Sequence, residues 1–448
     1  MGDLKRVRII TDKGSFEGIH LTDVAKDNRK FLLLKLDNGY NIGIAYDNIK
    51  KKEVLSKLSE TAWQTGDESK AQSIDSRNWD SSLVIIHTGG TIASKIDYET
   101  GAVKALFNPE EIVGLFPEIK GDYNIKSKLL LNIFSEDLNF KVYNLILKEI
   151  ENLVKSKENI RGIILTHGTD TLHYTSAALK FALENLPFPI VLVGAQRSSD
   201  RPSTDARYNL IAAASFINYV YENRLKSDVF VCMHGSVNDD FNYIFDAFNV
   251  RKMHTSRRDA FKQINDEPLA KVFKNGDVKI INDKLKKADS TKTKKNFKAK
   301  YYRESLKIGV LYAHPNLFPQ EILAFSRFDG LILAGTGLGH LAINKSEDNV
   351  TIDNTKNLQA LKQLINSDTL VVVAPQTING RINLNVYSTG RLLREAGVLG
   401  NLCDMTIETA FIKLAYLLSN YSVEKAKELY EKNLCGEINE RSRYFQDF

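Results

Sequence analysis

Residues 162–194, GIILTHGTDTLHYTSAALKFALENLPFPIVLVG, contain the pattern that decides the fold. A short apolar run at 163–165 precedes a helix-like stretch at 177–186, and a second apolar run follows at 190–193. Continuous runs of Val, Ile and Leu separated by amphipathic helices are typical of parallel strands in a sheet covered on both faces. This stretch therefore predicts a strand-helix-strand unit of an α/β domain.

The same alternation extends in both directions from this unit. Upstream lie the apolar run LVIIHT and the helix-like VYNLILKEIENLVKS, and downstream lie YNLIAAASFINYVYENR and DVFVCM. A second alternation of apolar runs and helical stretches begins at KIGVLYA and ends near TAFIKLAYLLS. We therefore expect a doubly wound parallel-sheet domain over 81–303 and a smaller C-terminal α/β domain with a helical tail over 304–448.

The first 80 residues follow a different pattern. Residues 1–56 are short alternating segments such as RVRII and KFLLLKL, separated by the turn signals DKG, DN and DNG. This spacing predicts a small β-barrel of the SH3-like or Sm-like kind. Residues 57–80 are polar, with no sustained apolar period, and are interpreted as a linker.

Composition excludes several classes of protein. With 448 residues, 43% of them hydrophobic, the chain buries enough apolar surface for two or three domains and is not disordered. Its 3 cysteines are far apart and form no CxxC motif, so neither a disulfide framework nor a thiolate metal site is predicted. No apolar stretch approaches the ~18 residues that span a bilayer, and no export signal is found. We expect a cytoplasmic protein that does not bind membranes.

The basic character of the chain is local. Residues 271–307 hold 13 Lys or Arg and 4 Asp or Glu, a net charge of +9, whereas the whole chain carries +6, so the remainder carries about −3. Such a run is usually a solvated loop, although a cationic segment also suits a phosphate backbone. The sequence leaves contact between this segment and RNA open.

Candidate catalytic residues follow three of the apolar runs, where ligands bind in doubly wound sheets. In TGGTIAS, Gly89 and Gly90 allow a tight turn whose N–H groups could hold an anion, with the Thr91 hydroxyl in the crevice. In THGTDT, Thr169 and Asp170 lie side by side, and Lys252 lies in a later polar loop. A threonine hydroxyl needs a base to become a nucleophile, so Thr, Lys and Asp form a coherent set of nucleophile, base and orienting group.

TGGTIA followed by THGTDT resembles the paired signatures of the asparaginase and glutaminase family of amidohydrolases, and the resemblance extends from about residue 83 to about 420. Within that family, the N-terminal barrel, the polar linker and the ending CGEINERS resemble the D subunits of archaeal glutamyl-tRNA(Gln) amidotransferases. The resemblance implies an asparaginase-like fold for the two α/β domains.

The resemblance also implies roles for individual residues. Thr91 matches the primary nucleophile, Thr169 and Asp170 match the second catalytic threonine and its aspartate, and Lys252 is placed by its distance to the DAF motif at 259–261. Which threonine attacks first stays open.

Three further residues match substrate-binding positions of the family. Tyr98 resembles the tyrosine of a mobile loop that closes over the substrate. Ser135 and Glu136 resemble the pair that grips the α-groups of the amino acid, although many asparaginases carry Gln in place of Glu136. This difference in sequence suggests altered substrate recognition.

The resemblance implies that glutamine or asparagine loses ammonia through a threonine acyl-enzyme. A partner E subunit would use ATP and Mg to convert Glu-tRNA(Gln) to Gln-tRNA(Gln), so tRNA would be bound mainly through that partner. This chain would need no cofactor, and it has no GxxxxGK[ST] phosphate-binding loop. Its histidines show no HExxH spacing, so no metal is predicted. The resemblance further implies a homodimer within a heterotetramer.

Two other interpretations remain open from the sequence. One is a free-standing cytoplasmic L-asparaginase with an accessory barrel. The other is a tRNA-binding scaffold on a degenerate amidohydrolase fold, using the barrel and segment 271–307. The presence of Thr91, Thr169, Asp170 and Lys252 argues against the scaffold.

Overall fold

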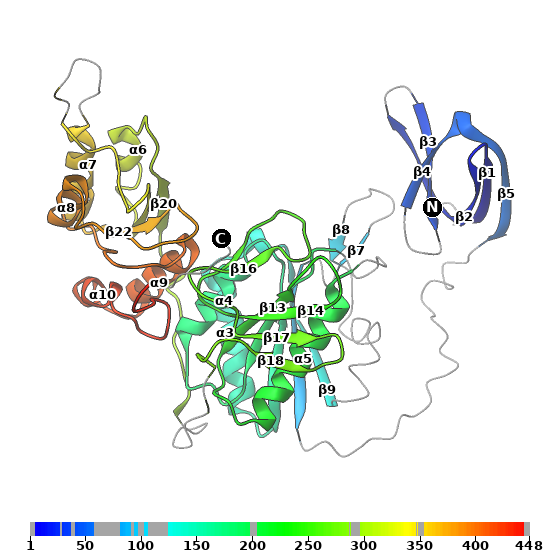
Figure 1. Ribbon diagram of the computed structural model, residues 1–448, viewed down its shortest axis with the longest axis horizontal. Helices are drawn as coiled ribbons and strands as arrows, with labels where there is room; N and C mark the ends of the chain where they lie inside the picture. Colours follow the sequence, from blue (N-terminus) through cyan, green and yellow to red (C-terminus); the bar gives the residue numbers. More distant parts are fainter. Residues whose placement is uncertain are drawn as a thin grey trace.

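The computed structural model describes a set of residues that covers the elements of all the predicted domains. These residues are 5–26, 29–36, 41–57, 81–90, 94–96, 103–105, 124–197, 204–285, 287, 296–345, 347 and 354–442. Figure 1 shows their helices and strands in the order in which they follow along the chain.

Five antiparallel strands form the N-terminal sheet, in the order β4-β3-β2-β1-β5. They are β1 (Lys5–Thr11), β2 (Gly14–Lys26), β3 (Arg29–Leu36), β4 (Asn41–Ala45) and β5 (Ile49–Lys57), with the 3-10 turn η1 (Tyr46–Asn48) before the last. The sheet has a small core of its own, made by Val7, Ile9, Leu32, Leu34 and Ile44. The predicted β-rich N-terminal module is confirmed, and its assignment to the SH3-like or Sm-like barrels stays a prediction.

The central sheet has eight strands in the order β18-β17-β14-β13-β12-β10-β6-β9. Their bounds are β6 (Ser82–Gly89), β9 (Asn124–Ile133), β10 (Ile160–Thr166), β12 (Ile190–Val193), β13 (Val229–His234), β14 (Phe241–Asp246), β17 (Ala270–Phe273) and β18 (Val278–Ile280). The five strands from β13 to β9 are parallel, as predicted.

The other three strands make this sheet mixed, which corrects the prediction of a parallel sheet. β14, β17 and β18 each pair antiparallel with their neighbours. Only six residues, 235–240, connect β13 to β14. A parallel crossover needs a dozen residues or more, so this connection can only make a hairpin.

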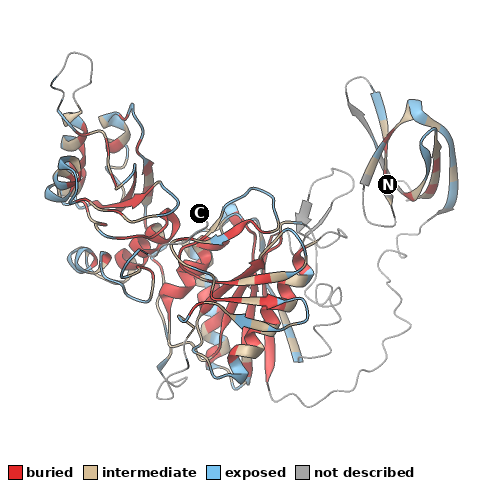
Figure 2. Ribbon diagram, in the orientation of Figure 1, coloured by how far each residue is buried: buried red, intermediate tan, exposed pale blue. Residues whose placement is uncertain are grey.

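Helices cover both faces of the central sheet. α3 (Phe140–Lys155) and α4 (Leu172–Ala182) share one core cluster with alternate strand residues such as Ile163 and Leu165. α5 (Ala206–Glu222) packs on the opposite face with the intervening Ile164. Figure 2 shows the central strands buried between these layers. The prediction of an α/β domain with two covered faces is therefore confirmed.

α4 differs in its bounds from the predicted helix at 177–186. It ends at Ala182 because the next two residues, β11 (Leu183–Glu184), pair antiparallel with β19 (Lys298–Ala299). Asn185 then takes a φ of 55°, which ends any helical continuation.

The C-terminal domain has three parallel strands, β20 (Ile308–Tyr312), β21 (Gly330–Gly335) and β22 (Leu370–Pro375). Its helices are α6 (Pro319–Leu323), α7 (Thr355–Asn366), α8 (Ser388–Glu395), α9 (Ile407–Asn420) and α10 (Val423–Tyr430). α9 packs against β21 and also against α4 of the preceding domain. As a result, one hydrophobic core runs through both α/β domains.

Two pairs of short strands and one 3-10 turn complete the described structure. β7 (Ser94–Ile96) pairs with β8 (Val103–Ala105), and β15 (Val250–Lys252) pairs with β16 (Phe261–Gln263) as a hairpin. The 3-10 turn η5 (Ser135–Asp137) follows β9. Among the described residues, no helix is both long and apolar enough to cross a membrane.

Candidate active site

The two strand-end turns singled out in the sequence touch each other through glycine backbone. β6 ends at Gly89 and is followed by Gly90, and the two residues have φ values of 108° and 81°. A Cβ atom at Gly90 would lie 2.5 Å from the Cα and N atoms of Gly168, in the turn that follows β10. Glycine is needed at position 90 both for its positive φ and for this close approach.

The 3-10 turn η5 is the third segment that packs at this site. A Cβ atom at Gly168 would lie 2.7 Å from the Cβ of Ser135, so η5 packs directly on the turn after β10. The Thr171 hydroxyl donates a 2.6 Å hydrogen bond to the carbonyl oxygen of Ser135. Ser135 is thereby held beside the predicted catalytic turn, whereas Glu136 is exposed.

The predicted Thr, Lys and Asp set comes together in the structure. The amine of Lys252 lies 2.8 Å from the Thr169 hydroxyl and 2.7 Å from a carboxylate oxygen of Asp170. Thr169 is buried, whereas the Asp170 side chain is 65% exposed and that of Lys252 is 11% exposed. The amine is therefore shielded from water on the side where it meets the threonine.

Lys252 reaches this position from the β15–β16 hairpin, 82 residues after Asp170 in the chain. Lys252 pairs with Phe261 across the hairpin, and the Met253 N–H donates to the Ala260 carbonyl oxygen at 2.7 Å. The DAF motif used to place Lys252 in the sequence thus ends at the first residue of the strand opposite it, Phe261.

Two buried histidines form hydrogen bonds at the strand ends that carry the site. His87 of β6 bonds the Thr166 hydroxyl and the Ser127 hydroxyl, each at 2.9 Å. His167 contacts the Gly168 carbonyl oxygen at 2.6 Å and the Thr175 hydroxyl at 2.8 Å. Burial lowers the pKa of both imidazoles to about 4. Both rings are therefore neutral at physiological pH, and their polar contacts fix the strand ends.

No group of three or more potential metal-binding side chains occurs among the described residues. The oxygen and nitrogen atoms of the Thr169, Asp170 and Lys252 set bond one another. This set therefore suits proton transfer to and from a hydroxyl.

Two predicted site residues, Thr91 and Tyr98, lie outside the described residues. Gly89, Gly90, Ser135, Thr169, Asp170 and Lys252 are brought to the same edge of the central sheet.

Sequence reasoning missed a second polar group beside this site. Glu408, at the start of α9, lies 3.3 Å from the Arg251 guanidinium and 3.7 Å from the His173 imidazole. Burial would raise the pKa of Glu408, but the hydrogen bond and charge of His173, together with the charge of Arg251, outweigh it and the pKa is lowered. No local pattern could reveal this group, because its members come from β15, α4 and α9.

Comparisons with known proteins match all three parts of the chain. Residues 1–55 match the family model described as GatD N-terminal domain. Residues 82–286 match the N-terminal asparaginase domain, and residues 307–430 match the glutaminase/asparaginase C-terminal domain. The D subunit of the glutamyl-tRNA(Gln) amidotransferase of Thermofilum pendens is 37% identical over 446 residues, covering 98% of this chain and 93% of the relative. The chain belongs to this D-subunit family.

Other members of the D-subunit family are similarly close over nearly their whole length. The protein of that name from Thermococcus kodakarensis is 38% identical over 452 residues, covering 99% of this chain and 96% of the relative. That from Pyrococcus abyssi is 38% identical over 455 residues, with coverage of 99% and 96%.

Solved structures place the two α/β domains of this D-subunit family member among the asparaginases. The thermostable L-asparaginase from Thermococcus kodakarensis aligns with a TM-score of 0.65 and 27% identity, covering 80% of this chain and 99% of the asparaginase. A probable cytoplasmic L-asparaginase from Campylobacter jejuni aligns with a TM-score of 0.62 and 25% identity, covering 79% and 100%. The asparaginase-like fold is therefore confirmed.

Proposed function

We propose that this chain is the amide-hydrolysing subunit of a tRNA-dependent amidotransferase. It would release ammonia from glutamine or asparagine for the conversion of Glu-tRNA(Gln) to Gln-tRNA(Gln). The observation that carries the proposal is the contact of the Lys252 amine with both the Thr169 hydroxyl and the Asp170 carboxylate, at 2.8 and 2.7 Å. Similarity to D-subunit relatives over nearly the whole chain favours this function over a free-standing asparaginase or a scaffold.

The reaction is acyl transfer through a threonine ester. A threonine hydroxyl, assigned by the resemblance to Thr91, attacks the side-chain amide carbon, and backbone N–H groups of the glycine turns stabilise the oxyanion. As Thr91 attacks, its hydroxyl proton passes to Thr169, which gives its own proton to the neutral Lys252 amine oriented by Asp170. Lys252 then returns this proton through Thr169 to the amide nitrogen, and the C–N bond breaks to release ammonia. Water then attacks the ester and releases glutamate or aspartate.

Substrate binding is assigned to three other residues. Ser135 and Glu136 would hold the α-carboxylate and α-ammonium groups, and Ser135 is buried against the turn that carries Thr169. An anionic Glu136 adds attraction for the ammonium group. Tyr98 would close the site, so Tyr98→Phe should lose less activity than a catalytic substitution.

Lys252→Met tests the catalytic assignment, with Lys262→Met as its matched control. Lys262 lies on the other strand of the same hairpin, with a side chain that is 48% exposed. We expect Lys252→Met to lower kcat for ammonia release from glutamine and asparagine by about 10²- to 10⁴-fold. Thr169→Ala should lower kcat by a similar factor, and Lys262→Met should leave kcat unchanged. Undiminished turnover by Lys252→Met would contradict the assignment.

The partner is proposed to be an E subunit that uses ATP and Mg to activate Glu-tRNA(Gln), so that this chain needs no cofactor of its own. A homodimer of this chain within a heterotetramer, in the cytoplasm, is the proposed assembly, and sedimentation of the chain should give a dimer. Glutaminase rates should be compared for the chain alone, with the E subunit, and with the E subunit and Glu-tRNA(Gln). Stimulation in the third case supports an ammonia-transferring subunit, whereas equal rates with a preference for free asparagine support a free-standing asparaginase.

A further inference from the structure

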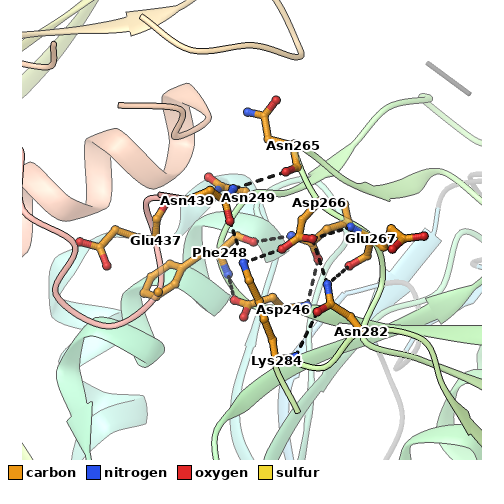
Figure 3. Close-up of polar contacts among 12 residues, drawn as sticks. Asp246, Phe248, Asn249, Asn265, Asp266, Glu267, Asn282, Lys284, Glu437 and Asn439 are labelled. Atoms are coloured by element: carbon orange, nitrogen blue, oxygen red, sulfur yellow. Dashed lines mark hydrogen bonds and ion pairs between the residues drawn. The ribbon is translucent and has the colours of Figure 1, made fainter. Parts of the chain in front are cut away.

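A network of hydrogen bonds and ion pairs surrounds the base of the hairpin that carries Lys252. Figure 3 shows part of this network, in which Glu437 contacts Asn249 and Asn439 contacts Asn265. Residues 434–439 are here called the tail segment. The hairpin starts after Asn249 and ends before Asn265, and both residues have a positive φ, of 55° and 59°. The Ile264 N–H donates to the Asn249 carbonyl oxygen at 2.7 Å, which draws the two ends together.

Asn249 connects the hairpin to the tail segment and to α9. Its side-chain amide donates to the Glu437 carbonyl oxygen at 3.1 Å and accepts from the Thr406 N–H, also at 3.1 Å. Its backbone N–H donates to the Thr409 hydroxyl at 3.1 Å. Asn249 is 4% exposed and lies three residues before Lys252. Movement of Asn249 would therefore be passed directly to the strand that presents the amine.

Glu437 fixes the tail segment at this point. Its carboxylate lies 2.6 Å from the Lys413 amine on α9, and both side chains are fully buried. The same carboxylate accepts hydrogen bonds from the N–H groups of Leu434 and Cys435, and the Lys413 amine also donates to the Lys432 carbonyl oxygen at 2.6 Å. A buried charge pair with these additional bonds has one geometry, so the Glu437 carbonyl oxygen that receives Asn249 is held still.

The other end of the hairpin is held in the same way. The Asn265 side chain bonds the Gly380 N–H at 2.8 Å and the Asp404 carbonyl oxygen at 2.8 Å. Asn439 of the tail segment donates to the Asp404 carboxylate at 2.9 Å and accepts from the Lys284 amine at 2.8 Å. Both ends of the Lys252 hairpin are thus bound to the C-terminal domain and the tail segment.

We propose that the tail segment sets the position of the Lys252 amine against Thr169 by holding Asn249, so that Asn249, Glu437 and Asn439 are positioning residues for the amide hydrolysis. This inference rests on the proposed function, because it assumes the catalytic role of Lys252. The physical reason is that a displacement of about 1 Å at a catalytic group can cost about 10²-fold in rate. The family model for the C-terminal domain ends at residue 430, before this segment.

Asn249→Gly is the direct test, since glycine accepts the positive φ and removes only the two side-chain hydrogen bonds. We expect kcat for glutamine and asparagine to fall by about 10- to 100-fold, with KM changed by less than about threefold. The matched control is Asn357→Ala in α7. Asn357 is 1% exposed and its side chain donates to the carbonyl oxygens of Leu317 and Ala342. Asn357→Ala should lower the free energy of unfolding by about as much as Asn249→Gly does, but its kcat should be normal.

A double-mutant cycle with Lys252→Met separates positioning from a general loss of structure. If Asn249 acts through Lys252, Asn249→Gly should lower the residual rate of Lys252→Met by less than about twofold. Asn439→Ala, a milder change at the outer end of the network, should lower kcat by about 3- to 10-fold and keeps the test available if Asn249→Gly does not fold.

Two results would overturn the inference and leave the proposed function standing. One is a normal kcat in the Asn249 and Asn439 variants while Lys252→Met is inactive. The other is a double variant of Asn249→Gly with Lys252→Met whose loss of rate is the product of the two single losses. Full activity of Lys252→Met would overturn the proposed function as well. All rates are to be measured on the full chain, well below its unfolding temperature.

Discussion

His87 and His167 are neutral in the folded protein because burial lowers the pKa of each to about 4, whereas an exposed imidazole titrates near 6.5. Between these two values the unfolded chain binds more protons than the folded chain. The free energy of unfolding should therefore fall as the pH drops from about 6.5 to about 4, by up to about 1.4 kcal/mol per pH unit for each histidine. The measurement is the unfolding free energy in denaturant between pH 7.5 and 4.

His167→Gln isolates one contribution to this slope. Glutamine does not titrate, so the dependence of stability on pH should be shallower than in the unsubstituted chain, even if the variant is less stable throughout. An equal slope in the His167→Gln variant and the unsubstituted chain would contradict the neutral, buried state of His167.

The Lys413–Glu437 pair gives a second prediction at the residue scale. Lys413→Met leaves a fully buried carboxylate without its cation and should lower the unfolding free energy by about 3–5 kcal/mol. Replacing both residues, as Lys413→Met with Glu437→Gln, should recover much of that loss. The exposed pair of Lys425 and Glu428 is the comparison, and Lys425→Met should cost less than about 1 kcal/mol. Equal losses of unfolding free energy in Lys413→Met and Lys425→Met, measured by denaturant unfolding, would contradict this prediction for the buried pair.

At the scale of elements, the contact between the strand-end turns depends on two glycines. Gly90→Ala would push a methyl group to 2.5 Å from Gly168, on the backbone next to Thr169. We expect it to cost about 1–3 kcal/mol of stability and to lower kcat at least about tenfold. Gly276→Ala is the matched control, because Gly276 has a similar φ of 89° and its added Cβ would meet only the Ser215 hydroxyl at 3.4 Å. Equal losses of kcat in both variants would show that the close approach is unimportant.

The sequence predicted those features of the elements that depend on local pattern. The apolar runs of β6, β10, β12 and β13 and the adjacency of Thr169 and Asp170 could be predicted, because period and turn residues are local signals. The sequence suggested Lys252 as a base in a later polar loop, but its contact with Asp170 could not be predicted because it joins residues 82 positions apart.

Features set by long-range packing were missed. The antiparallel pairing of β14 depends on the length of its connection, and the early end of α4 depends on pairing with β19. The roles of Asn249 and Glu408 depend on where α9 packs against α4. None of these partners is close in the chain, so neither propensity nor periodicity could reveal them.

At the scale of the whole molecule, one hydrophobic cluster joins the two α/β domains predicted from the sequence. One cluster contains Ile163 of β10 together with Ile332 of β21 and Leu414 of α9, so the two α/β domains share a core. The β1–β5 module has a separate cluster around Val7 and Leu32. Elements that share a core unfold together, whereas a module with its own core can unfold alone.

Calorimetry of the full chain should therefore show two transitions. At about 0.7 kcal/mol of unfolding enthalpy per residue, the β1–β5 module of about 50 residues should contribute about 35 kcal/mol, and the shared-core unit several times more.

A chain consisting of residues 81–448 should lack the smaller transition and keep the larger one. It should also hydrolyse free asparagine with unchanged kcat, since every described contact of Thr169 and Lys252 lies after residue 80. Any loss caused by the truncation should appear only when ammonia is transferred to tRNA through the partner. A single transition whose van't Hoff enthalpy equals the total calorimetric enthalpy of the full chain would show that the N-terminal module and the α/β domains unfold as one unit, and would contradict this division.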